Sequence, residues 1–518
     1  MPILITEVLL LGTAAALATL RVARPRFRFS WLLALAATIA AWLSVWVWMP
    51  QLPLSFAAPL WRSASSPNSF ASFTVSSVSW TYALCLVTLA LAVLLTAPAR
   101  STGPNPSSWA LCLTIVGLGL LAAAAEGPLT LVLFWAGLDL LEAGVVLARG
   151  ENRSSDGQVP LAFAVRLGSM ALVLLALVMH DSVEAGSGFN AIRGPVALLF
   201  PVAAMLRLTA FAVPWPRGSA SVRLDEVGTT LHLVAGSSAI AFLSQLAPEA
   251  QSNRSALLVV CAGAALFGSW MWFRAPDRNS SRPLWVFTIG SLAVAAALLG
   301  NPVGASGWGS AMLLVGSALF LRTVRERWLD RALLLGLWIS SAMPFALTSV
   351  AWLGGGGGPD WMVPGLLISQ ALLLAGLFHR VLRREIEPSP PIEMAWLRGI
   401  YRAGIALPLV LGLLLGIWGW SGAFQFGAPL AGAIVIPFAA AFAWAKWRFS
   451  FLSPVSTSWV PPAWQRASSG IRRELTRLHG GLQRAAETIT LTIEGEAGIM
   501  WSLLLLVLFA SLIASRDQ

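Results

Sequence analysis

Charged residues are scarce in this sequence. Asp, Glu, Lys and Arg make up 11% of its 518 residues, and Lys446 is the single lysine. A soluble globular domain carries about 25% charged residues, so the chain is not predominantly a soluble domain. Hydrophobic residues account for 57% of the chain, and the mean hydropathy is +0.75. This composition predicts an all-α polytopic membrane protein.

Cysteine and histidine are also rare, with three and four copies. The cysteines form no CxxC pair and no metal-ligand spacing, and the histidines are scattered. The sequence has no glycine-rich phosphate loop. These absences predict no catalytic residue, no cofactor and no metal site in this chain. The cysteines are Cys85, Cys112 and Cys261, and the histidines are His180, His232, His379 and His479.

The basic residues indicate how the chain crosses the membrane. The net charge is +11, but the basic residues lie in short loops, which favours membrane topology over nucleic-acid binding. Most of them follow odd-numbered apolar runs, so the positive-inside rule places these loops in the cytoplasm and both termini outside. We expect the cytoplasmic (inner) membrane of a prokaryote. The first basic cluster, Arg21 to Arg28, follows the first apolar run, unlike in a signal peptide. Glu7, at the start of that run, is expected to be solvated at the outer surface.

Apolar runs long enough to cross about 30 Å of hydrocarbon occur about sixteen times. We divide the chain into an N-terminal three-helix segment (1–107), two five-helix blocks (108–254 and 255–382), two further spans (383–460), a lateral helix (461–497) and a final anchor span (498–518). The runs lie near residues 3–20, 31–49, 79–97, 108–125, 128–148, 159–179, 194–213, 229–247, 255–273, 284–300, 304–321, 332–353, 361–379, 401–420, 427–445 and 498–515.

The two five-helix blocks predict an inverted repeat. An odd number of spans gives consecutive blocks opposite orientations, as in inverted-repeat transporters. Pro201 and Pro214 in the first block, and Pro344 in the second, occupy equivalent spans. Proline frees backbone groups within a membrane helix, so we predict a helix break at these positions.

The segment 461–497 shows a different pattern. Apolar residues recur at steps of three and four from Ala467 to Ile493, with Arg and Glu on the opposite face. This periodicity predicts an amphipathic helix lying along the cytoplasmic interface. It would contact either neighbouring subunits or lipid alone.

Four charged residues lie together in three consecutive apolar spans, 128–148, 159–179 and 194–213. A charge at the centre of a bilayer costs about 2.5–3.5 kcal/mol or more, so Asp139, Glu142, Arg166 and Arg207 are candidate functional residues with partners. Asp139 and Glu142 share one helical face at i,i+3 spacing, but the sequence leaves open which carboxylate pairs with which arginine. They would either form structural ion pairs or belong to a proton path, which His232 could feed.

Several segments resemble the antiporter-like proton-channel subunits of respiratory complex I, whose relatives occur in membrane-bound hydrogenases and Mrp antiporters. The segment from Gly137 to Glu142 resembles the fifth-helix motif of that family, with Asp139 at the position of its glutamate. Arg207 stands where the family has a seventh-helix lysine, and His232 matches an eighth-helix histidine of the largest subunit. Ser76 replaces an aspartate that precedes the third helix. The resemblance implies a membrane-arm subunit of a quinone reductase or hydrogenase that is not itself catalytic.

The chain also departs from this family. The family's path uses buried lysines, and arginine cannot replace lysine as a proton carrier because it stays protonated. The second block has no charged residue or histidine in mid-span between Ser255 and Phe378. We therefore expect a subunit of an ion-translocating oxidoreductase, with other membrane subunits as partners, an incomplete proton path and a scaffold role. The alternatives are an active proton or cation/proton channel, and a subunit of an inorganic-carbon or small-solute transporter.

Overall fold

The computed structural model describes one compact unit within residues 1–455. The residues described are 2–24, 29–57, 72–99, 106–148, 158–180, 188–189, 192, 194–212, 226–246, 254–275, 278–323, 326–352, 362–382, 394–418 and 429–448. The predicted lateral helix (461–497) and the anchor span (498–518) lie outside these residues.

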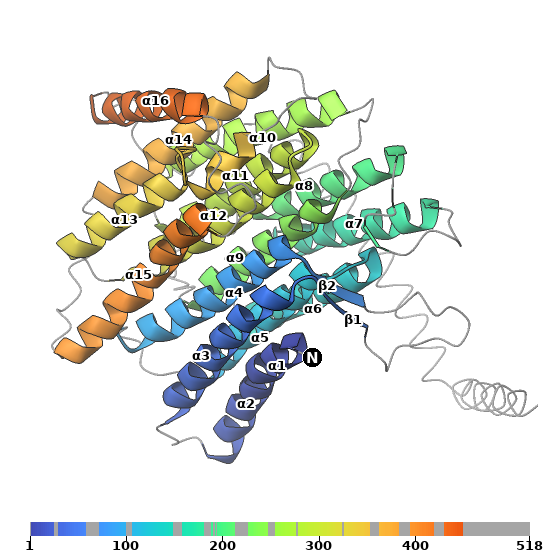
Figure 1. Cartoon of the computed structure of the whole chain (residues 1–518), viewed down its shortest axis with the longest axis vertical. Helices are drawn as coiled ribbons and strands as arrows, with labels where there is room; N and C mark the ends of the chain where they lie inside the picture. Colours follow the sequence, from blue (N-terminus) through green and yellow to red (C-terminus); the bar gives the residue numbers. More distant parts are fainter. Residues whose placement is uncertain are drawn as a thin grey trace, which may run out of the picture. The chain divides into compact units, whose positions relative to one another are not determined.

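The N-terminal part consists of helices and one hairpin (Figure 1). The strands β1 and β2 pair antiparallel, with Phe56 opposite Phe73. This hairpin was not predicted, because four-residue strands in a Ser-rich connector carry no clear alternation. The elements are α1 (Pro2–Glu7), the π-helix η1 (Val8–Gly12), α2 (Thr13–Ala23), α3 (Ser30–Trp48), η2 (Met49–Gln51), β1 (Leu54–Ala57), β2 (Ser72–Val75), α4 (Ser77–Thr96) and η4 (Ala97–Ala99).

Two groups of helices occupy the predicted five-helix blocks, and two further helices follow them. The inverted relation between the blocks stays a prediction. The first group contains α5 (Pro106–Ala124), α6 (Pro128–Ala148), α7 (Gln158–Met179), η6 (Gly194–Leu198), α8 (Leu199–Ala212), α9 (Glu226–Ala241) and η7 (Phe242–Gln245). The second contains α10 (Arg254–Arg274), α11 (Arg278–Leu298), α12 (Pro302–Leu321), α13 (Arg327–Ile339), η8 (Leu347–Trp352) and α14 (Val363–Leu382). The last two described helices are α15 (Ala395–Trp418) and α16 (Pro429–Arg448).

Fourteen helices in the described part of the chain are long and apolar enough to cross a membrane. This confirms the prediction of an all-α polytopic membrane protein in its main feature. Of the sixteen spans expected, 332–353 is not one continuous helix, because α13 ends at Ile339. The span 498–515 lies outside the described residues.

The most deeply buried helices are α4, α9 and α12, whose apolar stretches are 89%, 94% and 94% buried. Helix α12 packs against both of the others, and α9 also packs against α5. Nearly all of their residues are buried, and most are apolar or small, with serine and glycine between larger side chains. A helix that is apolar all round is expected inside a bundle, so these three helices form the core around which the others pack.

The chain between α13 and η8 is not helical. Ala342 and Phe345 adopt positive φ angles of 59° and 65°, and Pro344 lies between them. Gln370 of α14 fastens this segment, since its Nε2 donates to the Ser340 carbonyl at 2.8 Å while its Oε1 accepts from Trp352 at 3.0 Å.

We expect Gly416→Ala to destabilise the protein, because helix α15 packs directly against this non-helical segment. A Cβ at Gly416 would collide with the carbonyl oxygen of Phe345, a backbone atom that cannot rotate away. Gly399 of the same helix has nothing within 4 Å of its Cβ position, so Gly399→Ala is the matched control. The midpoint of thermal unfolding of the detergent-solubilised protein should fall for Gly416→Ala and hold or rise for Gly399→Ala. Equal midpoints for the two variants would contradict the close approach.

Candidate functional site

Three neighbouring helices carry the four buried charges predicted from the sequence. Asp139 and Glu142 lie one turn apart on α6, Arg166 lies on α7 and Arg207 on α8. Helix α7 packs against both α6 and α8. The exposed fractions of Asp139, Glu142, Arg166 and Arg207 are 2%, 6%, 4% and 1%. The structure therefore brings all four together in the interior of the helix bundle.

Asp139 pairs with Arg207 through two hydrogen bonds. The Nη1 and Nη2 atoms of Arg207 donate to the two carboxylate oxygens at 3.0 and 2.7 Å. This bidentate geometry fixes the plane of both groups and is stronger than a single neutral hydrogen bond.

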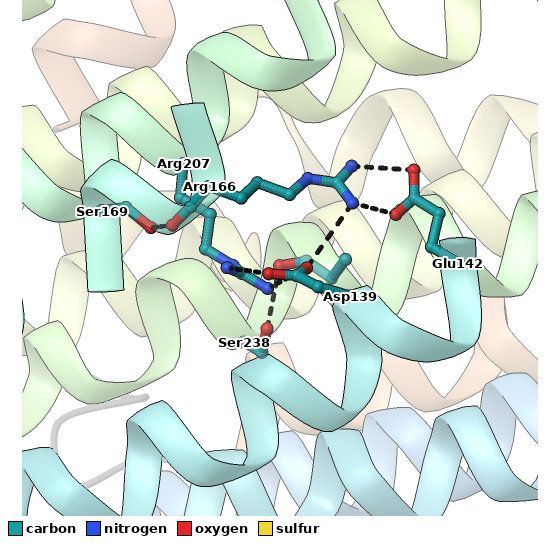
Figure 2. A network of polar contacts seen from close by, with 7 residues as sticks. Asp139, Glu142, Arg166, Ser169, Arg207 and Ser238 are labelled. Carbon is teal, nitrogen blue, oxygen red and sulfur yellow. Dashed lines mark hydrogen bonds and ion pairs between the residues drawn. The ribbon is translucent and has the colours of Figure 1, made fainter. Parts of the chain in front are cut away.

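Glu142 pairs in the same way with Arg166 (Figure 2). The Nη2 atom of Arg166 donates to Oε1 at 2.9 Å, and its Nη1 donates to Oε2. The two pairs are joined, because Nη1 of Arg166 also lies 3.5 Å from Oδ1 of Asp139. The order of contact is Glu142, Arg166, Asp139 and Arg207, and we call these four residues the charge network. This order answers the question of pairing that the sequence left open.

Aromatic rings cover both arginines. The Arg207 guanidinium lies over the Trp135 ring at 4.5 Å, and the Arg166 guanidinium lies over Phe211 at 5.4 Å. A cation over an aromatic face is stabilised by about 0.5–2 kcal/mol, with the larger value at desolvated sites. The rings also keep the surroundings apolar, so each arginine is confined to a narrow range of positions.

His232 lies on α9, beside the charge network. Its ring meets Phe211 edge to face, with 5.7 Å between centroids. Phe211 therefore contacts both His232 and Arg166. The predicted relay histidine and the network thus share one aromatic neighbour.

The charge network is formally neutral, with two carboxylates and two guanidinium groups. Each carboxylate already accepts two hydrogen bonds from an arginine. Such a buried arrangement resists the removal of any one member, because its partner would keep an uncompensated charge. As it stands, the site can hold three helices in register. A carboxylate could take up a proton only if its arginine moved away.

The three predicted helix-break prolines have different surroundings. Pro201 lies in the first turn of α8, directly after the 3-10 helix η6, where proline needs no backbone partner. Pro344 lies in the non-helical segment between α13 and η8. Pro214 lies outside the described residues.

Three buried polar side chains around the helix break of the second block are bonded locally, those of Ser341, Thr348 and Gln370. The Oγ1 of Thr348 accepts from the Ala342 N–H at 3.1 Å, and the Oγ of Ser341 donates to the Trp338 carbonyl at 2.8 Å. Gln370 is bonded at both ends of its amide. These groups satisfy the backbone that the helix break frees. None of them changes charge.

The expectation for Glu7 was wrong. It is not solvated but 6% exposed, and it packs beside Gly117 of α5. We expected Glu7 at the membrane surface because it is close to the start of the first apolar run. Glu7 can approach α5 closely because Gly117 has no side chain. A single sequence does not show that these two residues are in contact.

The chain resembles known proteins in its structure. No protein-family model and no curated protein matches the sequence. A chain of the Mrp complex from Dietzia sp. aligns with TM-score 0.71 and 15% identity over 100% of this chain and 63% of that one. This chain therefore spans less than two thirds of the length of the Mrp chain.

Two other structures align over most of both chains. A chain of Thermus thermophilus respiratory complex I gives TM-score 0.57 and 18% identity over 80% of this chain and 98% of that one. A chain of the archaeal membrane-bound sulfane sulfur reductase gives 0.59 and 12% over 99% and 100%. Identities this low establish the fold alone. The chain thus has the fold of the antiporter-like membrane subunits of these complexes, as its sequence motifs indicated.

Proposed function

We propose that the chain is an antiporter-like membrane subunit of an ion-translocating oxidoreductase complex, in which it acts as a scaffold and its own proton path is incomplete. It would lie in the inner membrane of a prokaryote with both termini outside, in contact with other membrane subunits. The fold shared with chains of respiratory complex I, of the membrane-bound sulfane sulfur reductase and of the Mrp complex supports a place in a multisubunit membrane complex.

The charge network is the observation that supports a scaffold role. A relay group must gain and lose a proton, and an arginine does not release one at physiological pH. Both network cations are arginines held in two-point contact with a carboxylate, whereas a lysine in the same place could titrate. The polar side chains around the helix break of the second block, those of Ser341, Thr348 and Gln370, are hydroxyls and an amide, which do not change charge.

The test compares proton translocation by the intact complex in proteoliposomes. The variants are Asp139→Asn, Glu142→Gln and the double variant Asp139→Asn with Arg207→Gln, which stays neutral. Native gels measure the assembly of each variant. We expect the protons moved per electron to stay at the wild-type value in every complex that assembles, and single variants to lose assembly. Normal assembly with reduced pumping would show that the network carries protons, which is the alternative function.

A further inference from the structure

Glu7 is a buried acid outside the charge network. It ends α1 and is 6% exposed. Neither of its carboxyl oxygens has a hydrogen-bond partner among the described residues. Every member of the charge network has an opposite charge within contact, and Glu7 differs from them in this respect.

The surroundings of Glu7 are apolar and tightly packed. A Cβ built on Gly117 of α5 would lie 3.1 Å from Oε2 of Glu7 and 2.8 Å from Cδ2 of Leu11. The hydroxyl of Thr6, the residue before Glu7, is bonded to the Ser44 hydroxyl of α3 at 2.8 Å. The carboxyl group therefore lies against a glycine surface and aliphatic side chains.

The backbone changes its winding at the same point. The π-helix η1 begins at Val8, directly after Glu7, and ends at Gly12. Segments of π-helix are uncommon and often occur at functional sites, because the wider turn repositions the side chains beside it. Here the wider turn lies where α1 and η1 meet α5.

The surroundings of Glu7 suit a proton and not a metal ion. A bare carboxylate without water or donors is very unfavourable in an apolar interior, and the group takes a proton instead. A metal cation requires several oxygen ligands, and the described residues contain no group of three or more acidic, histidine or cysteine side chains that could hold one. A single buried carboxyl group suffices for a proton.

We infer that Glu7 is a proton-binding site that takes up and releases a proton, separate from the charge network. The inference does not depend on the proposed scaffold role. Glu7 packs on α5, whereas the network lies on α6, α7 and α8. Helix α5 separates them, with Gly117 facing Glu7 and the neighbouring Leu118 in contact with Gly137 of α6.

Infrared difference spectroscopy of the full-length chain in its membrane complex tests this directly. Spectra in acid and alkaline buffer are compared for wild type, Glu7→Gln and Glu126→Gln, a matched control in the turn before α6. A protonated carboxyl group gives a C=O stretching band that vanishes on ionisation. Exposed carboxyl groups also contribute bands in acid, so each variant's difference spectrum is subtracted from that of wild type. We expect Glu7→Gln to remove one reversible band of a carboxyl group without hydrogen bonds, and Glu126→Gln to leave that band in place.

A second measurement needs no variant. Dicyclohexylcarbodiimide adds to carboxyl groups in the membrane only when they are protonated, so mass spectrometry of the wild-type peptide should show an adduct on Glu7 that declines as the pH rises. A band or an adduct that persists unchanged at every pH would mean a permanently neutral side chain, and the inference would fail. It would fail equally if Glu7→Gln left the band intact. Neither readout depends on pumping, so failure here leaves the proposed function untouched.

Discussion

Replacing Arg207 by methionine is expected to lower the free energy of unfolding by about 3–5 kcal/mol, the usual cost of removing one partner of a buried ion pair. Asp139, which is 2% exposed, would lose both hydrogen bonds from Arg207 and keep only the more distant contact with Arg166 at 3.5 Å. Methionine fills much of the same volume, so the loss reports the charge and not a cavity. Reversible unfolding in mixed detergent micelles measures it.

Two controls separate this effect from a general intolerance of substitution. Arg402→Met is the same change at a pair with Glu326 in which the arginine is 42% exposed, where an ion pair contributes about 0–1 kcal/mol. The double variant Asp139→Asn with Arg207→Met removes the charge on both sides and should regain most of the stability lost. A double variant as unstable as Arg207→Met alone would show that the charges are not coupled as the geometry indicates.

The sequence predicted the membrane spans well because hydrocarbon imposes a length of about 20 apolar residues on every one of them. It also identified Asp139, Glu142, Arg166 and Arg207, since a charge inside an apolar run is conspicuous against a background with 11% charged residues. It could not assign the pairs. Pairing depends on how three helices are rotated about their axes, and one sequence contains no information on contacts between residues such as Asp139 and Arg207, 68 positions apart.

Other features depended on local detail that composition does not reveal. The hydropathy of residues 332–353 predicts one continuous span. In the structure the helix ends at Ile339, and Ala342 and Phe345 adopt positive φ angles. Pro344 indicated a helix break. It did not indicate that Gln370 of the next long helix, α14, would stabilise the non-helical segment by a hydrogen bond to the Ser340 carbonyl. Glu7 is buried because it packs against Gly117 of α5. The hydropathy pattern does not show which helices are neighbours, so it could not predict this contact.

Trp135→Ala is expected to have the second large effect, a loss of about 3–5 kcal/mol, as for other large aromatic side chains truncated in a core. Trp135 is fully buried, lies 4.5 Å from the Arg207 guanidinium and meets Phe242 edge to face at 5.7 Å. Truncation leaves a cavity directly beneath the arginine. Trp447→Ala is the control, because that side chain is 83% exposed and should change the midpoint of unfolding little. A comparable loss in both variants would contradict the packing described here.

Trp135→Phe distinguishes the two functions proposed for the charge network. In a working proton path Arg207 must swing away from Asp139, and the cation–π contact with Trp135 opposes that movement. Phenylalanine keeps an aromatic ring but attracts the cation less than tryptophan does, so it would ease the swing and alter pumping in complexes that assemble normally. In a scaffold the arginine stays in place, and Trp135→Phe should lower stability modestly with no change in protons moved per electron. We expect the second result, because the two-point contact with Asp139 remains after the ring is exchanged.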